Sequence, residues 1–115
     1  MVIGESKSFT NKEGKMIKVI VGFEQKQGTD IQPILLKLRS HAMTFPGFIS
    51  SENIRSVNNP SIVALLYNWE KLENWKAWEI SKVRQKLLQE AEALLVSKPK
   101  LTIYAIMPTS AWDSY

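Results

Sequence analysis

The chain has 115 residues, of which 44% are hydrophobic, with 15 Lys and Arg, 11 Asp and Glu, and no cysteine. This length and composition are typical of one globular domain with a buried core. Without cysteine, disulfides, thiolate nucleophiles and Cys-ligated metals are excluded. No apolar run approaches the ~20 residues of a membrane span, and the polar start of the chain does not resemble a signal peptide, so we expect a cytoplasmic protein without a membrane partner.

The net charge of +4 is spread along the chain. The densest basic cluster, Lys82, Arg84 and Lys86, belongs to a segment that becomes acidic at Glu90 and Glu92. Proteins that bind nucleic acids usually gather Lys and Arg on one face, together with aromatic side chains on which bases stack. The pattern therefore favours a solvated helix surface and no nucleic-acid partner.

The first confident strand is predicted at residues 16–24, where apolar and polar residues alternate. After a short loop, Thr29 or Asp30 opens a helix whose apolar residues follow the helical period up to residue 42. The turn signal Pro46-Gly47 then ends this helix.

Two further strands are predicted at 48–57 and 62–69, joined by the tight turn Asn58-Asn59-Pro60. This spacing is typical of an antiparallel hairpin. The first strand of the pair is half polar, which suits either a sheet edge or the wall of a polar cavity. The last strand is predicted at 101–107, after Lys98-Pro99 has ended the preceding helix.

The segment between these strands holds three of the four tryptophans and two apolar stripes. The first stripe contains Leu72, Trp75 and Trp78. The second stripe begins after Ser81 and points roughly 120° away if the helix is continuous. Because one straight helix cannot bury both stripes against one sheet, we predict two helices with a break at Ser81, whose hydroxyl suits an N-cap. The alternative is a single helix with exposed tryptophan.

The predicted order is β-α-β-β-α-β, an α+β, ferredoxin-like fold in which helices cover one face of a four-stranded antiparallel sheet. We assign this domain to residues 16–108, preceded by an N-terminal extension or extra strand at 1–15 and followed by a C-terminal tail at 109–115. The strands carry apolar residues on both faces, so the open face needs a cover. The simplest cover is a second copy in a C2 homodimer, and a fifth strand or a docked terminus is the alternative.

No motif of conventional catalysis is present, because the sequence lacks HExxH, GxSxG and GxxxxGK[ST], and its single histidine excludes a two-histidine metal site within one subunit. His41 stands late in the first predicted helix, where an imidazolium ion complements the helix dipole; a base facing a pocket is the alternative. Trp75 and Trp78 suit core packing or a flat wall for an aromatic ligand, with Tyr67 and Asn68 as polar neighbours.

Short anchors connect this pattern to a known family. They are Gly28-Thr29 before the first helix, Pro46-Gly47-Phe48 after it, the apolar strand running into Trp69-Glu70, and the stretch WKAWEIS at 75–81. With these anchors, residues 16–107 resemble the antibiotic biosynthesis monooxygenase (ABM) domain family of the dimeric α/β-barrel superfamily. The resemblance implies ferredoxin-like protomers that pair through their sheets into a barrel, each with a cavity between sheet and helices.

The activities that the resemblance implies are cofactor-independent oxygenation of aromatic polyketides or quinols, and haem degradation. The haem-degrading branch has an Asn on the first strand, a Trp on the helix after the third strand, and a His about ten residues further on. Trp78 resembles that Trp and is followed by Ser81, as in that branch. The position of that His corresponds to Leu88, however, so the axial ligand for haem is missing. Residues 21–23 also hold no Asn. Haem binding without turnover is a third, weaker hypothesis.

We therefore expect an ABM-type homodimer that needs no cofactor and no metal, and that oxygenates a small aromatic or quinol-like molecule in an apolar cavity. An electron-rich substrate, once deprotonated, passes an electron to oxygen while the protein holds its anion and excludes water. The residues assigned to catalysis are His41 and Tyr67, and those assigned to ligand binding are Trp75, Trp78, Asn68 and Phe23. The alternative function is a non-catalytic ligand-binding or dimerisation domain of the same fold.

Overall fold

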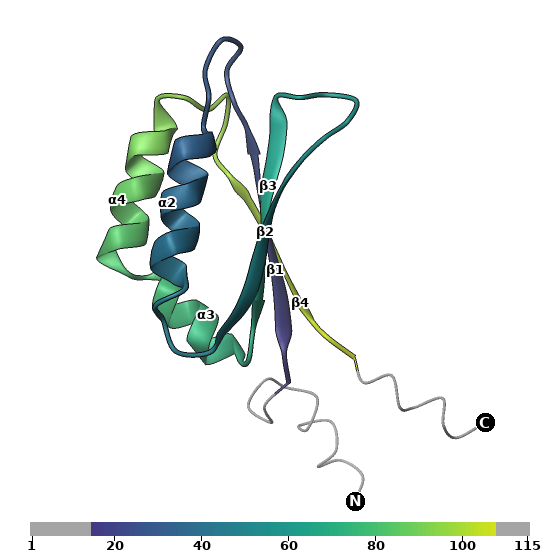
Figure 1. Cartoon of the computed structure of the whole chain (residues 1–115), viewed down its shortest axis with the longest axis vertical. Helices are drawn as coiled ribbons and strands as arrows, with labels where there is room; N and C mark the ends of the chain where they lie inside the picture. The colour runs from purple at the N-terminus through teal and green to yellow at the C-terminus, as the bar shows by residue number, and fades with distance from the viewer. Residues whose placement is uncertain (1–14, 108–115) are drawn as a thin grey trace, which may run out of the picture.

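The computed structural model describes residues 15–107, which form one layer of strands and one layer of helices (Figure 1). The elements run in the order β1 (Ile17–Glu24), α2 (Gln32–Ala42), β2 (Phe48–Arg55), β3 (Ile62–Trp69), α3 (Leu72–Glu79), α4 (Lys82–Glu92) and β4 (Lys100–Ala105). This confirms the predicted α+β, ferredoxin-like fold class. Apart from Lys15, the predicted N-terminal extension at 1–15 and the C-terminal tail at 109–115 lie outside the described residues.

The strands pair in the order β2-β3-β1-β4, and every neighbouring pair is antiparallel. The predicted hairpin between β2 and β3 is therefore confirmed, and the half-polar β2 lies at a sheet edge. The register places Val19 of β1 opposite Tyr67 of β3 on one side and opposite Ile103 of β4 on the other. Since residues directly opposite one another share a face of a sheet, all three point toward the helix layer.

The predicted break in the second helical segment is confirmed. α3 ends at Glu79, and α4 begins after Ser81, whose Oγ accepts a hydrogen bond from the backbone N–H of Arg84 at 3.3 Å. The break lets each helix take its own direction over the sheet. As a result both apolar stripes are buried, as shown by the low exposure of Trp75, Trp78, Leu87 and Ala91.

The first helix begins slightly later than predicted. Its N-cap is Ile31, which provides no side-chain cap. The hydroxyl of Thr29 donates instead to the Lys26 carbonyl oxygen at 2.7 Å, and Asp30 Oδ1 accepts from the Gln32 backbone N–H at 3.1 Å. Both predicted helix-opening residues therefore shape the loop before α2 rather than its first turn.

α4 ends earlier than predicted because the chain after it is bound to the end of β1. The backbone N–H of Lys26 donates to the Leu94 carbonyl at 2.7 Å, and that of Val96 donates to the Glu24 carbonyl at 2.8 Å. These bonds extend the sheet contacts at the top of the molecule and are incompatible with continued helical pairing.

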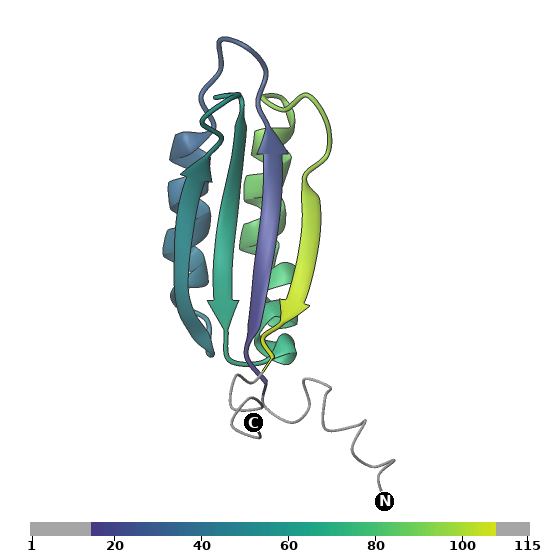
Figure 2. The ribbon, with the colours of Figure 1, turned by 90° about the vertical axis from the view of Figure 1, so that its right-hand side faces the viewer.

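The helices cover only one face of the sheet (Figures 1 and 2). On the uncovered face, Ile20 and Leu66 lie opposite each other and are half-buried, and Ile54 and Ile62 are exposed at 48% and 42%. The prediction of apolar side chains on both faces is therefore correct.

The helix layer is also narrower than the sheet. In Figure 2, α2 lies behind β2 and α4 lies behind β1, while β4 forms the free edge beyond α4. Leu101 and Ile103 of β4 lie opposite Val21 and Val19 and so point to the helix side, yet they are 42% and 38% exposed. This leaves an apolar strip of β4 open next to α4.

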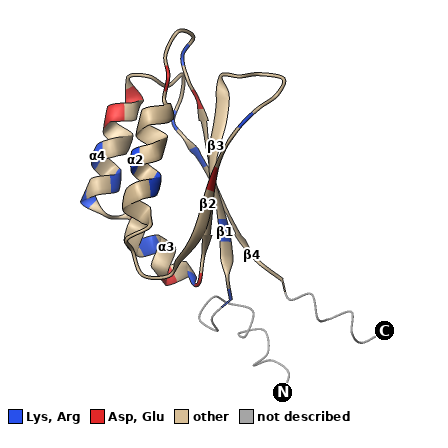
Figure 3. Cartoon of the chain, viewed as in Figure 1, with Lys and Arg blue, Asp and Glu red and all other residues tan. Residues whose placement is uncertain are grey.

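Within residues 15–107, no helix is long and apolar enough to cross a membrane. Lys and Arg are spread over the helices and strands and are interspersed with Asp and Glu (Figure 3). α4 is basic in its first turns and acidic in its last.

The turn between α2 and β2 depends on Gly47, which has φ +85°. A Cβ atom at this position would lie 2.1 Å from the side chain of Asn74, so the glycine also lets the turn approach α3. We predict that Gly47→Ala lowers the free energy of unfolding by roughly 3–5 kcal/mol, because backbone strain and overpacking act together. Urea denaturation measures this change.

Gly28→Ala is the matched control. Gly28 has the same φ of +85°, but an added Cβ would meet nothing within 4 Å. Only the backbone strain of about 1–2 kcal/mol is expected there. Equal losses of unfolding free energy in the two variants would show that overpacking against Asn74 adds nothing to the destabilisation.

Candidate active site between α4 and the edge strand

An aromatic cluster fills the space between β3 and α3. Tyr67 and Trp69 belong to the helix-facing positions of β3, and Trp75 and Trp78 belong to α3. The ring centroid of Tyr67 lies 5.7 Å from that of Trp75 and 6.0 Å from that of Trp69, and the edge of Phe45 packs on Trp78 at 5.1 Å. All four clustered side chains on β3 and α3 are at most 1% exposed. The tryptophans therefore belong to the core as well as to the surroundings of Tyr67.

This cluster contains several hydrogen-bond donors. Within the described residues, the indole Nε1 atoms of Trp69 and Trp75 have no hydrogen-bond partner, and that of Trp78 influences the Tyr67 hydroxyl without meeting hydrogen-bond geometry. A buried N–H group without a partner is unfavourable, because it has lost its bonds to water. The interior next to Tyr67 is thus rich in donors and poor in acceptors.

Burial raises the pKa of the Tyr67 hydroxyl to about 12, because the phenolate would be removed from water. The indole N–H of Trp78 and the positive charge of Arg84 act in the opposite direction and offset only part of the rise. At neutral pH, Tyr67 is therefore a protonated group that can donate, and it is not a base.

Arg84 lies at the border between the aromatic cluster and solvent. Its Cζ atom is 5.1 Å from the centroid of the Trp75 ring, and its Nη1 donates to the Glu79 carbonyl oxygen at 3.2 Å. Burial lowers the pKa of Arg84, and the charges of Tyr67 and Glu79 act in the opposite direction. An arginine still keeps its positive charge at neutral pH.

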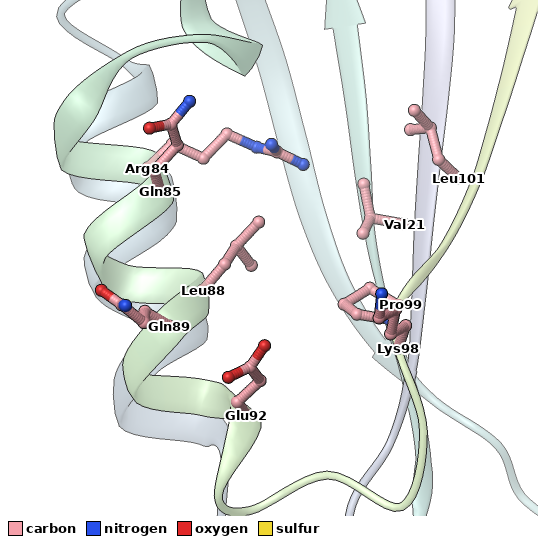
Figure 4. Close-up of a pocket in the computed structure, with 9 residues that line it drawn as sticks. All are labelled: Val21, Arg84, Gln85, Leu88, Gln89, Glu92, Lys98, Pro99 and Leu101. Carbon is pink, nitrogen blue, oxygen red and sulfur yellow. The ribbon is translucent and has the colours of Figure 1, made fainter.

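A cavity of about 510 Å³ lies next to Arg84, between α4 and β4 (Figure 4). Its apolar lining residues are Val21, Leu88, Pro99 and Leu101, and its polar ones are Arg84, Gln85, Gln89, Glu92 and Lys98. In Figure 4, Arg84 and Leu88 extend from α4 toward the strands, with Arg84 at one end and Glu92 and Lys98 at the other. An apolar middle with a few placed polar groups is typical of a small-molecule site.

The structure brings together three of the six predicted site residues, namely Tyr67, Trp75 and Trp78. His41 is exposed on α2. Asn68 lies on the uncovered face of the sheet, where its Nδ2 donates to Ser50 Oγ at 3.0 Å. Phe23 is buried and borders a second hollow of about 140 Å³ at the opposite end of the sheet from α3. None of the six predicted site residues lines the larger cavity; Tyr67, Trp75 and Trp78 lie in the buried aromatic cluster, which contacts the cavity residue Arg84 through Trp75.

Sequence reasoning missed Arg84 and Leu88 as cavity residues. The alternation of Lys82, Arg84 and Lys86 predicted a solvated helix surface, and the half-buried Arg84 does not fit that prediction because α4 turns it over Trp75. A signal was present, since Arg84 and Leu88 are four residues apart and therefore share one side of the helix.

The fold and cavity define a class: an α+β, ferredoxin-like domain with an open cavity beside its edge strand. Solved structures share this fold. A protein of Nitrosomonas europaea provisionally named an antibiotic biosynthesis monooxygenase matches with a TM-score of 0.76 and 14% identity, over 84% of this chain and 94% of that chain. A conserved protein from Methanosarcina mazei Go1 matches with a TM-score of 0.74 and 15% identity, over 84% and 97%.

A mutant of SnoaB, a cofactor-independent oxygenase from Streptomyces nogalater, matches with a TM-score of 0.73 and 10% identity, over 83% of this chain and 96% of that chain. No protein-family model matches the sequence, and no curated protein matches it at a significant level. The chain therefore has the fold of the antibiotic biosynthesis monooxygenases, which confirms the resemblance at the level of the fold.

Tyr67 makes the stability depend on pH in the alkaline range. The pKa of a free tyrosine is 10.0, and that of Tyr67 in the folded chain is about 12. The raised pKa contributes stability that is complete below pH 10 and is lost as the pH rises toward 12. We predict that the wild type loses roughly 2–3 kcal/mol more than Tyr67→Phe across this window.

Urea denaturation at a series of pH values measures this difference, and the comparison with Tyr67→Phe cancels the titration of lysines and other tyrosines. Parallel stability curves for the two proteins would contradict the buried, protonated Tyr67.

Proposed function

We propose that this protein is a cofactor-independent monooxygenase that binds a small aromatic or quinol-like molecule in the cavity between α4 and β4. The observation that carries the proposal is the cavity of about 510 Å³ with apolar walls, whose inner end holds Arg84 against Trp75. The monooxygenase fold and the oxygenase activity named for SnoaB support the reaction class.

The position of Leu88 supports an aromatic ligand over haem. In the ABM resemblance, the axial histidine of the haem-degrading branch falls at Leu88, and Leu88 lines the cavity. A leucine cannot ligate iron, but it offers an apolar surface to a flat ring. The proposed site therefore has an apolar side chain at the position where the resemblance to the haem-degrading branch places a metal ligand.

The reaction needs no external reductant. The phenolic substrate loses its hydroxyl hydrogen and the hydrogen of the para ring carbon, one atom of O₂ becomes a carbonyl oxygen on that carbon, and the other atom leaves with the two hydrogens as water. The deprotonated substrate supplies the first electron to oxygen. The protein then has to stabilise the anion, supply a proton and exclude water.

Each of these tasks has a candidate group. Arg84 presents N–H donors and a positive charge to the substrate oxyanion. Tyr67 stays protonated, and although it does not line the cavity, it interacts electrostatically with Arg84, which does. Trp75 positions the guanidinium by a cation–π contact. His41 is exposed on α2 and Asn68 lies on the uncovered face of the sheet, so neither has a role in this proposal.

Oxygen uptake tests the proposal. With 1,5-dihydroxynaphthalene as probe and a chelator in the buffer, we expect the wild type to consume oxygen and to place isotopically labelled oxygen in the quinone product. Arg84→Gln should lower kcat by roughly 100-fold or more, because it removes the group that stabilises the developing charge, and Tyr67→Phe should lower kcat less, because Tyr67 acts only through Arg84.

Lys86→Gln is the control, since it removes a positive charge from the exposed side of the same helix. It should keep the wild-type rate. Binding of the probe without oxygen uptake above the buffer rate would contradict the oxygenase and would indicate the non-catalytic ligand-binding domain instead.

We also propose that the protein is a homodimer that buries the uncovered sheet face. Ile20, Leu66 and Ile54 give this face an apolar centre, and a second copy covers it with the same surface. Light scattering should give twice the 13.1 kDa of one chain. Leu66→Glu should give the monomer, whereas Lys37→Glu on the exposed side of α2 should stay dimeric. A monomeric wild type would contradict this proposal.

A further inference from the structure

Arg84 is a half-buried cation that forms no ion pair among residues 15–107. Its side chain makes one hydrogen bond, to the backbone carbonyl of Glu79, and one cation–π contact, to Trp75. A guanidinium has five N–H donors, so most of its donors have no acceptor among residues 15–107. Removing a charge from water without an opposite charge nearby is unfavourable. Because Arg84 lines the cavity, the remaining donors are available to an acceptor from outside the chain.

The carboxylates near the cavity do not neutralise the charge of Arg84. Glu79 acts on Arg84 electrostatically but forms no ion pair with it within the described residues. Glu92 lies eight residues further along α4, which corresponds to about 12 Å along the helix. The other cation of the lining, Lys98, stands at that same far end (Figure 4). The end of the cavity at Arg84 is thus positively charged and open to a ligand.

The middle of the cavity fits a flat apolar body. Leu88 extends from α4, and Val21 and Leu101 face it from β1 and β4 (Figure 4). A ligand that fills the cavity with its charged group at Arg84 has its rings in the middle, between helix and sheet. The planar fork of a guanidinium matches a planar carboxylate in a two-point contact.

We infer that the molecule recognised by this cavity is an aromatic acid, whose carboxylate binds Arg84 and whose rings lie between Leu88 and Leu101. The inference rests on the proposed function for the location of the site, and it adds a permanent negative charge to the substrate class. Polar substituents at the other end of such a molecule reach Glu92 and Lys98.

Two ligands of the same shape test this inference. 2-Naphthoic acid carries the carboxylate, and 2-naphthamide replaces it with a neutral amide. We expect the wild type to bind the acid at least 10-fold more tightly than the amide at pH 7, as measured by calorimetry and by quenching of tryptophan fluorescence. Arg84→Gln should abolish the difference, and Lys86→Gln should preserve it.

Because Arg84 packs against Trp75, circular dichroism and urea denaturation should be used to test whether Arg84→Gln is folded. Arg84→Lys is a second variant, which keeps the positive charge and should keep part of the preference for the acid. The wild-type comparison stands without any variant. Equal binding of acid and amide by the wild type, or binding of neither, would overturn the inference.

Oxygen uptake separates this inference from the proposed function. A preference for the acid without any oxygen uptake would contradict the oxygenase and leave the acid site in place. Oxygen uptake with the neutral probe 1,5-dihydroxynaphthalene, together with equal binding of 2-naphthoic acid and 2-naphthamide, would contradict the acid site and support the oxygenase.

Discussion

The break in the helical segment at Ser81 is the constraint on which the rest of the structure depends. A continuous helix would leave one of its two apolar stripes in water. Burying a tryptophan removes about 150–250 Å² from solvent, which at about 25 cal/mol per Å² corresponds to roughly 4–6 kcal/mol for each of Trp75 and Trp78. An N-cap contributes only about 1 kcal/mol. Hydrophobic burial therefore requires the break, and the Ser81 hydroxyl decides at which residue it falls.

The same break determines where the cavity forms. Arg84 lies in the first turn of α4, so its backbone N–H is capped by Ser81 while its side chain folds back over Trp75 and reaches the carbonyl of Glu79. α4 then runs behind β1 and leaves the edge strand uncovered, which explains why Leu101 is exposed although it points to the helix side. One local feature thus brings a cation, an aromatic cluster and an open apolar wall to the same place.

The fold could be predicted from the sequence because each strand and helix repeats its own period. The strand at 62–69 and the break at Ser81 follow directly from alternation and from two incompatible stripes. The site could be predicted only in part. Periodicity identifies Trp75 and Trp78 as buried, but it does not tell a core wall from a cavity wall. The cavity arises from the width of the helix layer relative to the sheet, and the placement of Arg84 beside it arises from the direction of α4. The spacing of residues along one element predicts neither this width nor this direction.

Burial disfavours the charged form of both Arg84 and Tyr67. Loss of water raises the pKa of the phenol and lowers the pKa of the guanidinium, so both groups move toward their neutral forms while their mutual attraction opposes the move. For the fold alone, an apolar side chain at position 84 would pack on Trp75 without this desolvation cost. An arginine at this position is useful when an anion enters the cavity, because the attraction between opposite charges is then strengthened by the same low polarity that makes the unpaired cation unfavourable. The desolvation of Arg84 and its proposed role toward an anion are therefore two consequences of one arrangement.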